Sequence, residues 1–135
     1  MALEAMARPF ARDEQPWPGA GPLPARMGTD LWPLLLADLA AGVAPGRIAA
    51  RFHHTLAHAL ADSVALAARA GQRVVLSGGV MQNRVLLAAL RGALREKGLV
   101  PLTHRQVPAN DGGLALGQGV IAALAILREG AGWGT

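Results

Sequence analysis

Apolar residues recur at helical spacing in two neighbouring stretches of the first half of the chain. The first predicted helix begins at Thr29 or Asp30, either of which can cap it, and runs to Ala41 with Pro33 in its first turn. A longer helix begins near Pro45. Its expected inward stripe is Ile48, Phe52, Leu56, Leu60, Val64 and Ala67, with Gly71 as its left-handed cap. We expect the two helices to pack as a helical hairpin.

The N-terminal part of the chain is expected to be mostly irregular. Residues 2–8 read as the end of a helix, and residues 9–29 read as a loop that Trp17 could pin to the rest of the chain. The loop is rich in residues that break helices: Pro16, Pro18, Gly19, Gly21, Pro22 and Pro24. We therefore divide the chain into an N-terminal segment, 1–29, and a C-terminal subdomain, 30–135.

The hydrophobic period changes after the second helix. Residues 73–76 form a short β-branched, apolar run typical of a buried parallel strand, and residues 99–103 form a second one. Between them, residues 81–97 return to helical spacing, and residues 113–128 form a last helix. The predicted fold class is α/β, with a helical hairpin followed by a βαβα unit whose two strands are parallel.

This inventory of elements is incomplete for an independent sheet domain. Two strands cannot form a stable buried parallel sheet, and the apolar run from Val120 to Leu127 must be buried on most sides. The stretch from Leu114 to Leu127 is interrupted by glycines and falls short of the roughly 20 residues that span a bilayer. We expect part of a larger sheet domain, without a membrane span, in which uncovered surfaces favour self-association.

The turn after the first strand is a candidate ligand site. In open α/β sheets, ligands bind where a strand ends and a helix begins. The glycines Gly78 and Gly79 after Ser77 let a ligand approach the backbone, and Gln82 and Asn83 can hydrogen-bond a sugar or base, which makes these residues nucleotide-binding candidates. A glycine-rich strand-to-helix turn also arises for geometric reasons alone, and that interpretation stays open.

The loop after the second strand is the other candidate, because parallel neighbours would place both loops on one edge. Asp111 offers a carboxylate to a cation, and Asn110 and Gly112 lie beside a helix N-terminus. The alternative is that Asn110 or Asp111 only caps the helix. His104 lies at the same edge, so that it is either a catalytic group in the pocket or a surface residue.

Composition narrows the possible functions. The chain has 135 residues and no Cys, which excludes disulfides and thiolate chemistry of its own. Its net charge is only +4, and its arginines neither cluster nor interleave with aromatic residues, so nucleic-acid binding is not expected. His53, His54 and His58 suggest a metal site, because His54 and His58 lie one helical turn apart, but no Glu lies within the motif, and partly exposed helix residues explain them better. The N-terminus lacks a secretory signal, and we expect a cytoplasmic protein.

Two strings in the sequence resemble a known family. Val74-Val75-Leu76-Ser77-Gly78-Gly79-Val80-Met81-Gln82-Asn83-Arg84 and Thr103-His104-Arg105-Gln106-Val107-Pro108-Ala109-Asn110-Asp111-Gly112-Gly113-Leu114-Ala115-Leu116-Gly117-Gln118 look like the C-terminal end of HypF, the carbamoyltransferase of nickel–iron hydrogenase maturation. The resemblance covers roughly residues 30–128, and residues 2–7 look like a remnant of the preceding helix. The second string is specific, whereas the first is shared with the wider superfamily.

The resemblance implies part of the second half of an actin-like (ASKHA) domain. In that family the domain passes a carbamoyl group from carbamoyl-adenylate, made with ATP, to a C-terminal cysteine of the acceptor protein HypE. It implies that Ser77, Gly78, Gly79 and Asn83 line the adenylate pocket and that Asp111 is a ligand of a divalent metal, iron or zinc. The family's two metal-binding histidines and its upstream segments are missing from this chain, so they would have to come from the same or another polypeptide.

Two other functions remain open at this point. The chain could be a non-catalytic nucleotide-binding or protein-interaction module of the same fold, or, less in keeping with the His-Arg-Gln-Val-Pro string, a small-molecule O-carbamoyltransferase. Whether this chain is itself an enzyme is undecided, because it lacks half of the family's active site.

Overall fold

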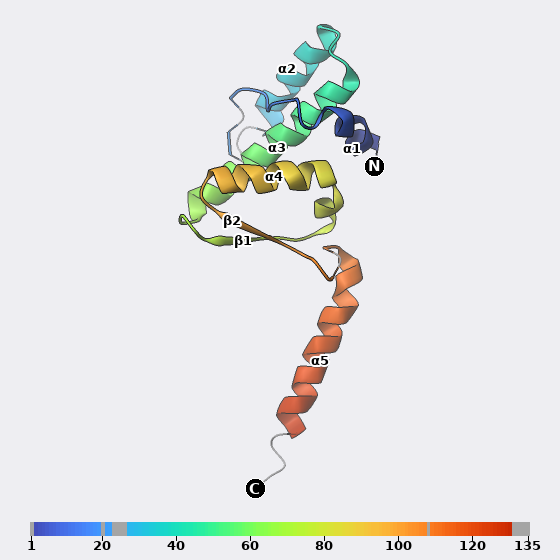
Figure 1. Cartoon of the computed structure of the whole chain (residues 1–135), viewed down its shortest axis with the longest axis vertical. Helices are drawn as coiled ribbons and strands as arrows, with labels where there is room; N and C mark the ends of the chain where they lie inside the picture. Colours follow the sequence, from blue (N-terminus) through green and yellow to red (C-terminus); the bar gives the residue numbers. More distant parts are fainter. Residues whose placement is uncertain (1, 20, 23–26, 108, 131–135) are drawn as a thin grey trace. The chain divides into compact units, whose positions relative to one another are not determined.

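The structure, a computed structural model, describes residues 2–19, 21–22, 27–107 and 109–130 (Figure 1). Pro24, Pro108 and residues 131–135 lie outside the described residues. The elements are α1 (Ala2–Ala7), η1 (Arg8–Phe10), α2 (Met27–Ala40), α3 (Pro45–Ala67), β1 (Arg73–Leu76), η2 (Gly79–Gln82), α4 (Arg84–Glu96), β2 (Val100–Thr103), η3 (Asp111–Gly113) and α5 (Leu114–Gly130), where η denotes a 3-10 helix. They form two compact units. The first runs to Val75 and resumes at Asn83–Leu102, and the second comprises Leu76–Gln82 and the chain from Thr103.

The long helix α3 is the centre of the first unit. It packs against α4, α1 and, as the predicted hairpin, α2. Because neighbours lie on several sides of α3, its buried face differs from the predicted stripe: Phe52, Leu56, Leu60 and Val64 are only half-buried. The buried residues of α3 are mostly small: Ile48, Ala49, Ala50, His53, Thr55, Ala57, Ala59 and Ala61. Small side chains allow the flanking helices to approach closely, as in the cluster that Ala49 and Ala50 form with Ala7 and Val85.

Helix α2 begins earlier than predicted, at Met27, so its start is not at Thr29 or Asp30 and Pro33 lies inside the helix. A proline there removes one backbone hydrogen bond. Burial offsets this cost, because Leu31 packs in one cluster with Trp17 and Ile48. The helix ends as expected near Gly42, which has a φ of +70°.

The N-terminal loop is held to the helices, as predicted for Trp17. The Trp17 side chain is buried, its backbone N–H donates to Thr55 Oγ1 at 2.9 Å, and its indole Nε1–H donates to Asp38 Oδ2 at 2.8 Å. Glu14 is also buried and accepts from Arg47 and Arg51, each at 2.7 Å. The Arg51 hydrogen bond, above all, lowers the pKa of Glu14 from its ordinary 4.5. Glu14 and Trp17 are therefore held to α2 and α3 by buried polar contacts.

The predicted strand–helix–strand unit is confirmed. The two strands form a two-stranded parallel sheet, and α4 between them buries Leu86, Leu90 and Leu94. Two helix boundaries differ from the prediction. Helix α4 begins at Arg84, because residues 79–82 form η2, and α3 ends at Ala67. Gly71 is not the cap of α3. With a φ of +78° it turns the chain into β1, and its N–H donates to the Gly98 carbonyl at 2.8 Å.

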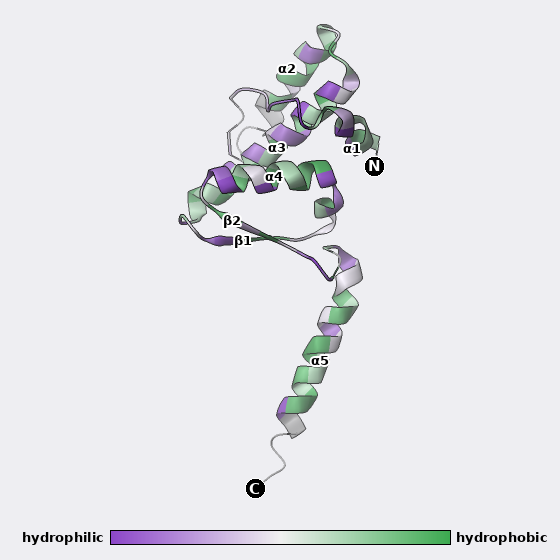
Figure 2. Ribbon diagram, viewed as in Figure 1, coloured by the Kyte–Doolittle hydropathy of each residue, from purple (hydrophilic) through white to green (hydrophobic). Residues whose placement is uncertain are grey.

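Much apolar surface remains uncovered within the described residues. On the sheet, Val75 is 68% exposed, and Val100 and Leu102 are also exposed. Along α5 every described side chain is exposed, although the helix is predominantly hydrophobic (Figure 2). The stretch Asp111–Arg128 has 18 residues at a mean hydropathy of 1.2, so by length and composition alone it is long and apolar enough to cross a membrane, which differs from the expectation for Leu114–Leu127. A core helix of a larger domain passes the same test.

Candidate functional site

The two candidate loops meet in the second unit, as the parallel strands predicted. One follows β1 and the other follows β2. The Gly78 N–H donates to the Ala109 carbonyl at 2.6 Å, and Ser77 Oγ lies 3.0 Å from His104 Nε2. The Ser77 and His104 side chains are both exposed. A hydroxyl and an imidazole at this distance can exchange a proton with each other or with a bound molecule.

The backbone at Gly78 explains why a glycine stands there. Its φ of +102° lies in the region that side-chain-bearing residues rarely adopt. From Gly78 the chain enters the short turn η2, whose first residue is Gly79, and Met81 N–H closes that turn on the Gly78 carbonyl at 3.0 Å. Gln82 ends η2 with its side chain exposed. Gly78 therefore has both a geometric role and a position beside the other loop.

In the loop after β2, Asn110 caps the following helical turn, which was one of the two interpretations of this loop. Asn110 Oδ1 accepts from the Gly112 N–H at 3.1 Å, and the Asn110 carbonyl accepts from Gly113 N–H at 3.0 Å. Asp111 is exposed at the start of η3. Among the described residues, no group of three or more His, Asp or Glu side chains is placed to hold a metal ion. The residues present therefore do not form a metal site by themselves.

Asn83 lies in the first unit, where both ends of its amide have partners. Its Oδ1 accepts from the Leu86 N–H at 3.0 Å and so caps α4, and its Nδ2 donates to His53 Nε2 at 2.8 Å. His53 is 2% exposed, and its Nδ1–H donates to the Ala49 carbonyl at 2.6 Å. The sequence did not predict this hydrogen bond between His53 and Asn83, because two residues 30 positions apart leave no local sequence pattern.

The neighbouring histidines of α3 have different hydrogen-bond partners. The His54 Nε2–H donates to the Ala11 carbonyl at 2.8 Å, whereas His53 turns to Asn83 and Ala49. His54 is half-buried, and its contact with Ala11 ties the N-terminal segment to α3. His58 is half-buried farther along the same helix.

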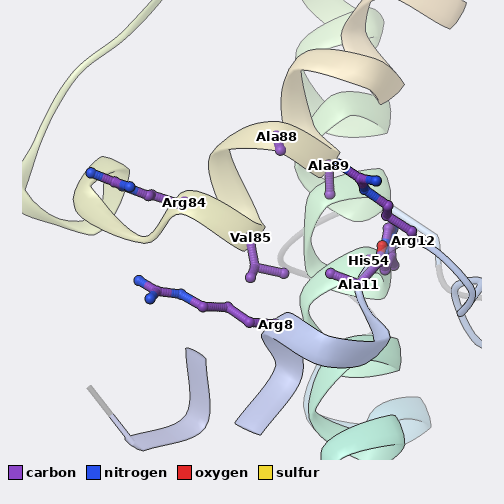
Figure 3. Close-up of a pocket in the computed structure, with 8 residues that line it drawn as sticks. All are labelled: Arg8, Ala11, Arg12, His54, Arg84, Val85, Ala88 and Ala89. Carbon is purple, nitrogen blue, oxygen red and sulfur yellow. The ribbon is translucent and has the colours of Figure 1, made fainter. Parts of the chain in front are cut away.

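A cleft lies between the N-terminal segment and α4 in the first unit, and the sequence did not predict it. This cationic cleft has a volume of about 610 Å³ (Figure 3). Its lining residues are Arg8, Ala11, Arg12, His54, Arg84, Val85, Ala88 and Ala89. Beside it, Glu4 is buried and its Oε1 accepts from Arg8 Nη2 at 3.0 Å and from the Arg84 backbone N–H at 3.1 Å. The Arg8 hydrogen bond is the main cause that lowers the pKa of Glu4.

Comparison with known proteins identifies the domain. Residues 1–118 match the model of the family described as "Carbamoyltransferase, Kae1-like Domain, second subdomain". Curated relatives include Carbamoyltransferase HypF of Rhizobium leguminosarum bv. viciae, 50% identical over 103 residues, and HypF2 of Cupriavidus necator, 47% identical over 103 residues. These alignments cover 74% and 75% of this chain.

A solved structure agrees with the sequence relatives. The crystal structure of T. kodakarensis HypF matches with a TM-score of 0.68 and 26% identity over 93% of this chain. The chain spans only a small part of these proteins: 14% of the Rhizobium protein, 13% of the Cupriavidus protein and 16% of the T. kodakarensis chain. The chain therefore belongs to the HypF carbamoyltransferase family and corresponds to the second subdomain of its Kae1-like domain.

Proposed function

We propose that this chain supplies the second half of a carbamoyl-transfer site, which moves a carbamoyl group from carbamoyl-adenylate to the C-terminal cysteine of a HypE-type acceptor protein in hydrogenase maturation. Family membership supports the reaction class. The observation that carries the proposal is the joining of the two loops, through Gly78 N–H with the Ala109 carbonyl and Ser77 with His104. The remaining parts of the site come from upstream HypF segments, in the same or a separate polypeptide, and the reaction takes place in the cytoplasm.

In this proposal the two loops together bind the adenylate, and His104 moves the proton. The Ser77, Gly78 and Gly79 turn, with Gln82, Asn110 and Gly112 around it, holds the adenylate. The acceptor thiol attacks the carbamoyl carbon, its sulfur–carbon bond forms, and the bond from that carbon to the phosphate oxygen breaks to release AMP. His104 accepts the thiol proton at Nδ1, while its Nε2–H donates to the Ser77 hydroxyl 3.0 Å away, which orients the ring. Asn83, which is predicted to line the pocket, caps α4 with its amide oxygen.

We also propose that Asp111 gives one carboxylate ligand to a divalent ion, iron or zinc, once ligands from outside this chain are present. The Asp111 residue is exposed. One carboxylate holds such an ion weakly, since stable sites use three or four protein ligands. No step of the transfer is assigned to the metal here.

The proposal is tested by calorimetric titration of the chain with a hydrolysis-resistant carbamoyl-adenylate analogue. We expect Ser77→Ala to weaken binding about fivefold, the effect of losing one hydrogen bond. His104→Ala should bind the analogue about as well, but should lose most transfer activity when the chain is combined with the upstream HypF segments and a HypE-type acceptor. His58→Ala, a histidine of the other unit, is the matched control and should change neither quantity.

Two outcomes would overturn the proposal. One is transfer at the full rate with His104→Ala, which would remove the proton acceptor from the mechanism. The other is a chain that remains folded by circular dichroism and shows neither analogue binding alone nor transfer with the upstream segments. The latter result would favour the non-catalytic module.

A further inference from the structure

The positive charges that line the cationic cleft are only partly paired with acceptors among the described residues. Arg8 is partly neutralised by Glu4, and its side chain is still 58% exposed. In the described part of the chain, no acceptor contacts the side chains of Arg12 or Arg84, which are both exposed. His54 is engaged by the Ala11 carbonyl. The cleft therefore carries excess positive charge, for which the described residues supply only Glu4 as an anion.

The arginines flank an apolar floor. In Figure 3, Arg8 and Arg84 come from the two walls and extend in the same direction, while Arg12 stands on the other side near His54. Between them lie the small side chains Val85, Ala88 and Ala89. A single small anion requires donors that converge on one point, whereas separated cations around a floor of small residues suit an extended ligand with apolar and acidic groups.

The contacts of Glu4 show that Arg8 and the start of α4 can bind a carboxylate. Its carboxylate bridges the Arg8 guanidinium and the Arg84 backbone N–H. Guanidinium groups favour carboxylates because their planar donors match two oxygens. Arginine is also enriched in transient protein interfaces, where rim charges remain hydrated and avoid the cost of burying an ion.

We propose that the cationic cleft is a docking surface for an acidic, partly apolar segment of a separate protein. Carboxylates of that segment pair with Arg12 and Arg84 on either side of the floor, and an apolar side chain between them contacts Val85, Ala88 and Ala89. The cationic cleft shares no lining residue with the loops of the proposed carbamoyl-transfer site, so failure of this proposal leaves that one untouched.

The test is a fluorescence-anisotropy titration of the chain with a labelled twelve-residue peptide in which Glu pairs flank a Leu-Ala core. The matched probe has Gln in place of every Glu. We expect saturable binding of the Glu peptide only, about tenfold weaker in the Arg12→Ala/Arg84→Ala variant, since two surface ion pairs are lost. Neither side chain has a hydrogen bond or ion pair with the described residues, so this variant should melt like the parent. Raising the salt from about 20 mM to about 300 mM should weaken binding further.

A control variant removes equal charge elsewhere in the same unit. Arg69→Ala/Arg73→Ala, in exposed positions before and in β1, should bind the Glu peptide like the parent chain. Equal losses in both variants, or no binding of the Glu peptide, would overturn the proposal. Binding of inorganic triphosphate but not of the peptide, lost in Arg12→Ala/Arg84→Ala, would overturn it in favour of a small-anion site. Self-association lost in that variant would instead identify a second copy as the occupant.

Discussion

At the residue scale, the most informative side chain is one that the sequence pointed to for another reason. Asn83 was predicted to line a nucleotide pocket, and that role stays a prediction. The structure shows its amide joining the start of α4 to the buried His53. Since Nδ1–H of His53 donates to the Ala49 carbonyl, its Nε2 is the acceptor for Asn83. A cap is predictable from local sequence, but its buried partner 30 residues away is not.

Two substitutions at Asn83 separate these contacts. Asn83→Ala removes the cap and leaves His53 Nε2 without its donor, so we expect the free energy of unfolding to fall by about 2 kcal/mol. Asn83→Ser keeps a capping oxygen and should cost about 1 kcal/mol. Urea denaturation followed by circular dichroism measures both. Equal losses for the two variants would show that the His53 contact, rather than the cap, carries the stability.

At the scale of elements, the approach of α3 to the N-terminal segment depends on Gly46. A Cβ at Gly46 would lie 2.7 Å from the Met6 carbonyl oxygen and equally close to Phe10 Cδ2. Backbone at that distance has to move. The Pro-rich composition of residues 9–29 predicted an irregular segment, but it held no information on which helix residue the segment touches. That contact is set by packing between residues 40 positions apart.

We therefore expect Gly46→Ala to destabilise the chain by about 1–3 kcal/mol, although alanine favours helices. Gly92→Ala is the matched control on α4, because nothing lies within 4 Å of its added Cβ. It should stabilise the chain by about 0.5–1 kcal/mol. Thermal melts of the two variants provide the comparison. A neutral or stabilising Gly46→Ala would contradict the close approach of α1 and η1 to α3.

The ion pairs between the N-terminal loop and the helices predict how stability depends on pH. Arg51 also pairs with Asp38 at 2.9 Å, so Glu14 links the loop to both α3 and α2. Because the folded pKa of Glu14 lies below its ordinary 4.5, its stabilisation is complete above that value and is lost as pH falls through the folded pKa. Glu4, whose pKa is also lowered, acts in the same direction.

Glu14→Gln tests this link. The variant should lose about 1 kcal/mol of stability at neutral pH and should show a shallower loss than the parent below pH 4.5. Denaturation midpoints between pH 7 and 3 measure both effects. Asp13→Asn, which changes an exposed neighbour in the same loop, is the control and should be as stable as the parent at neutral pH. Parallel profiles for parent and Glu14→Gln would remove Glu14 from this account.

At the scale of the whole molecule, the exposed apolar surface agrees with the small share of its relatives that this chain represents. The α5 side chains of Ile121, Ile126 and Leu127 are each about 70% exposed. An apolar helix with hydrophobic residues on several faces is stable only when other surfaces cover it. In the isolated chain we expect a second copy to provide part of that cover, in keeping with the expectation of self-association.

Ile121→Lys/Leu127→Lys should weaken this self-association at least tenfold. Each apolar side chain that is buried on association contributes about 1.5–3 kcal/mol to the free energy of association. Sedimentation equilibrium over a range of concentrations measures the change. Gln118→Lys, which adds charge at a polar position of the same helix, is the control and should associate almost like the parent. An unchanged association in the double variant would place the contact elsewhere, for example on the exposed side of the sheet at Val75.

Local patterns in the sequence determined the element types, the parallel strands and the joining of the Ser77 and His104 loops, because hydrophobic period and strand ends act over short distances. The family followed from two strings, of which the longer is specific. Only the tertiary structure decided the burial of His53 and Glu14, the early start of α2 and the cationic cleft. These features depend on contacts between residues far apart in the chain, and such contacts leave no periodic trace in a single sequence.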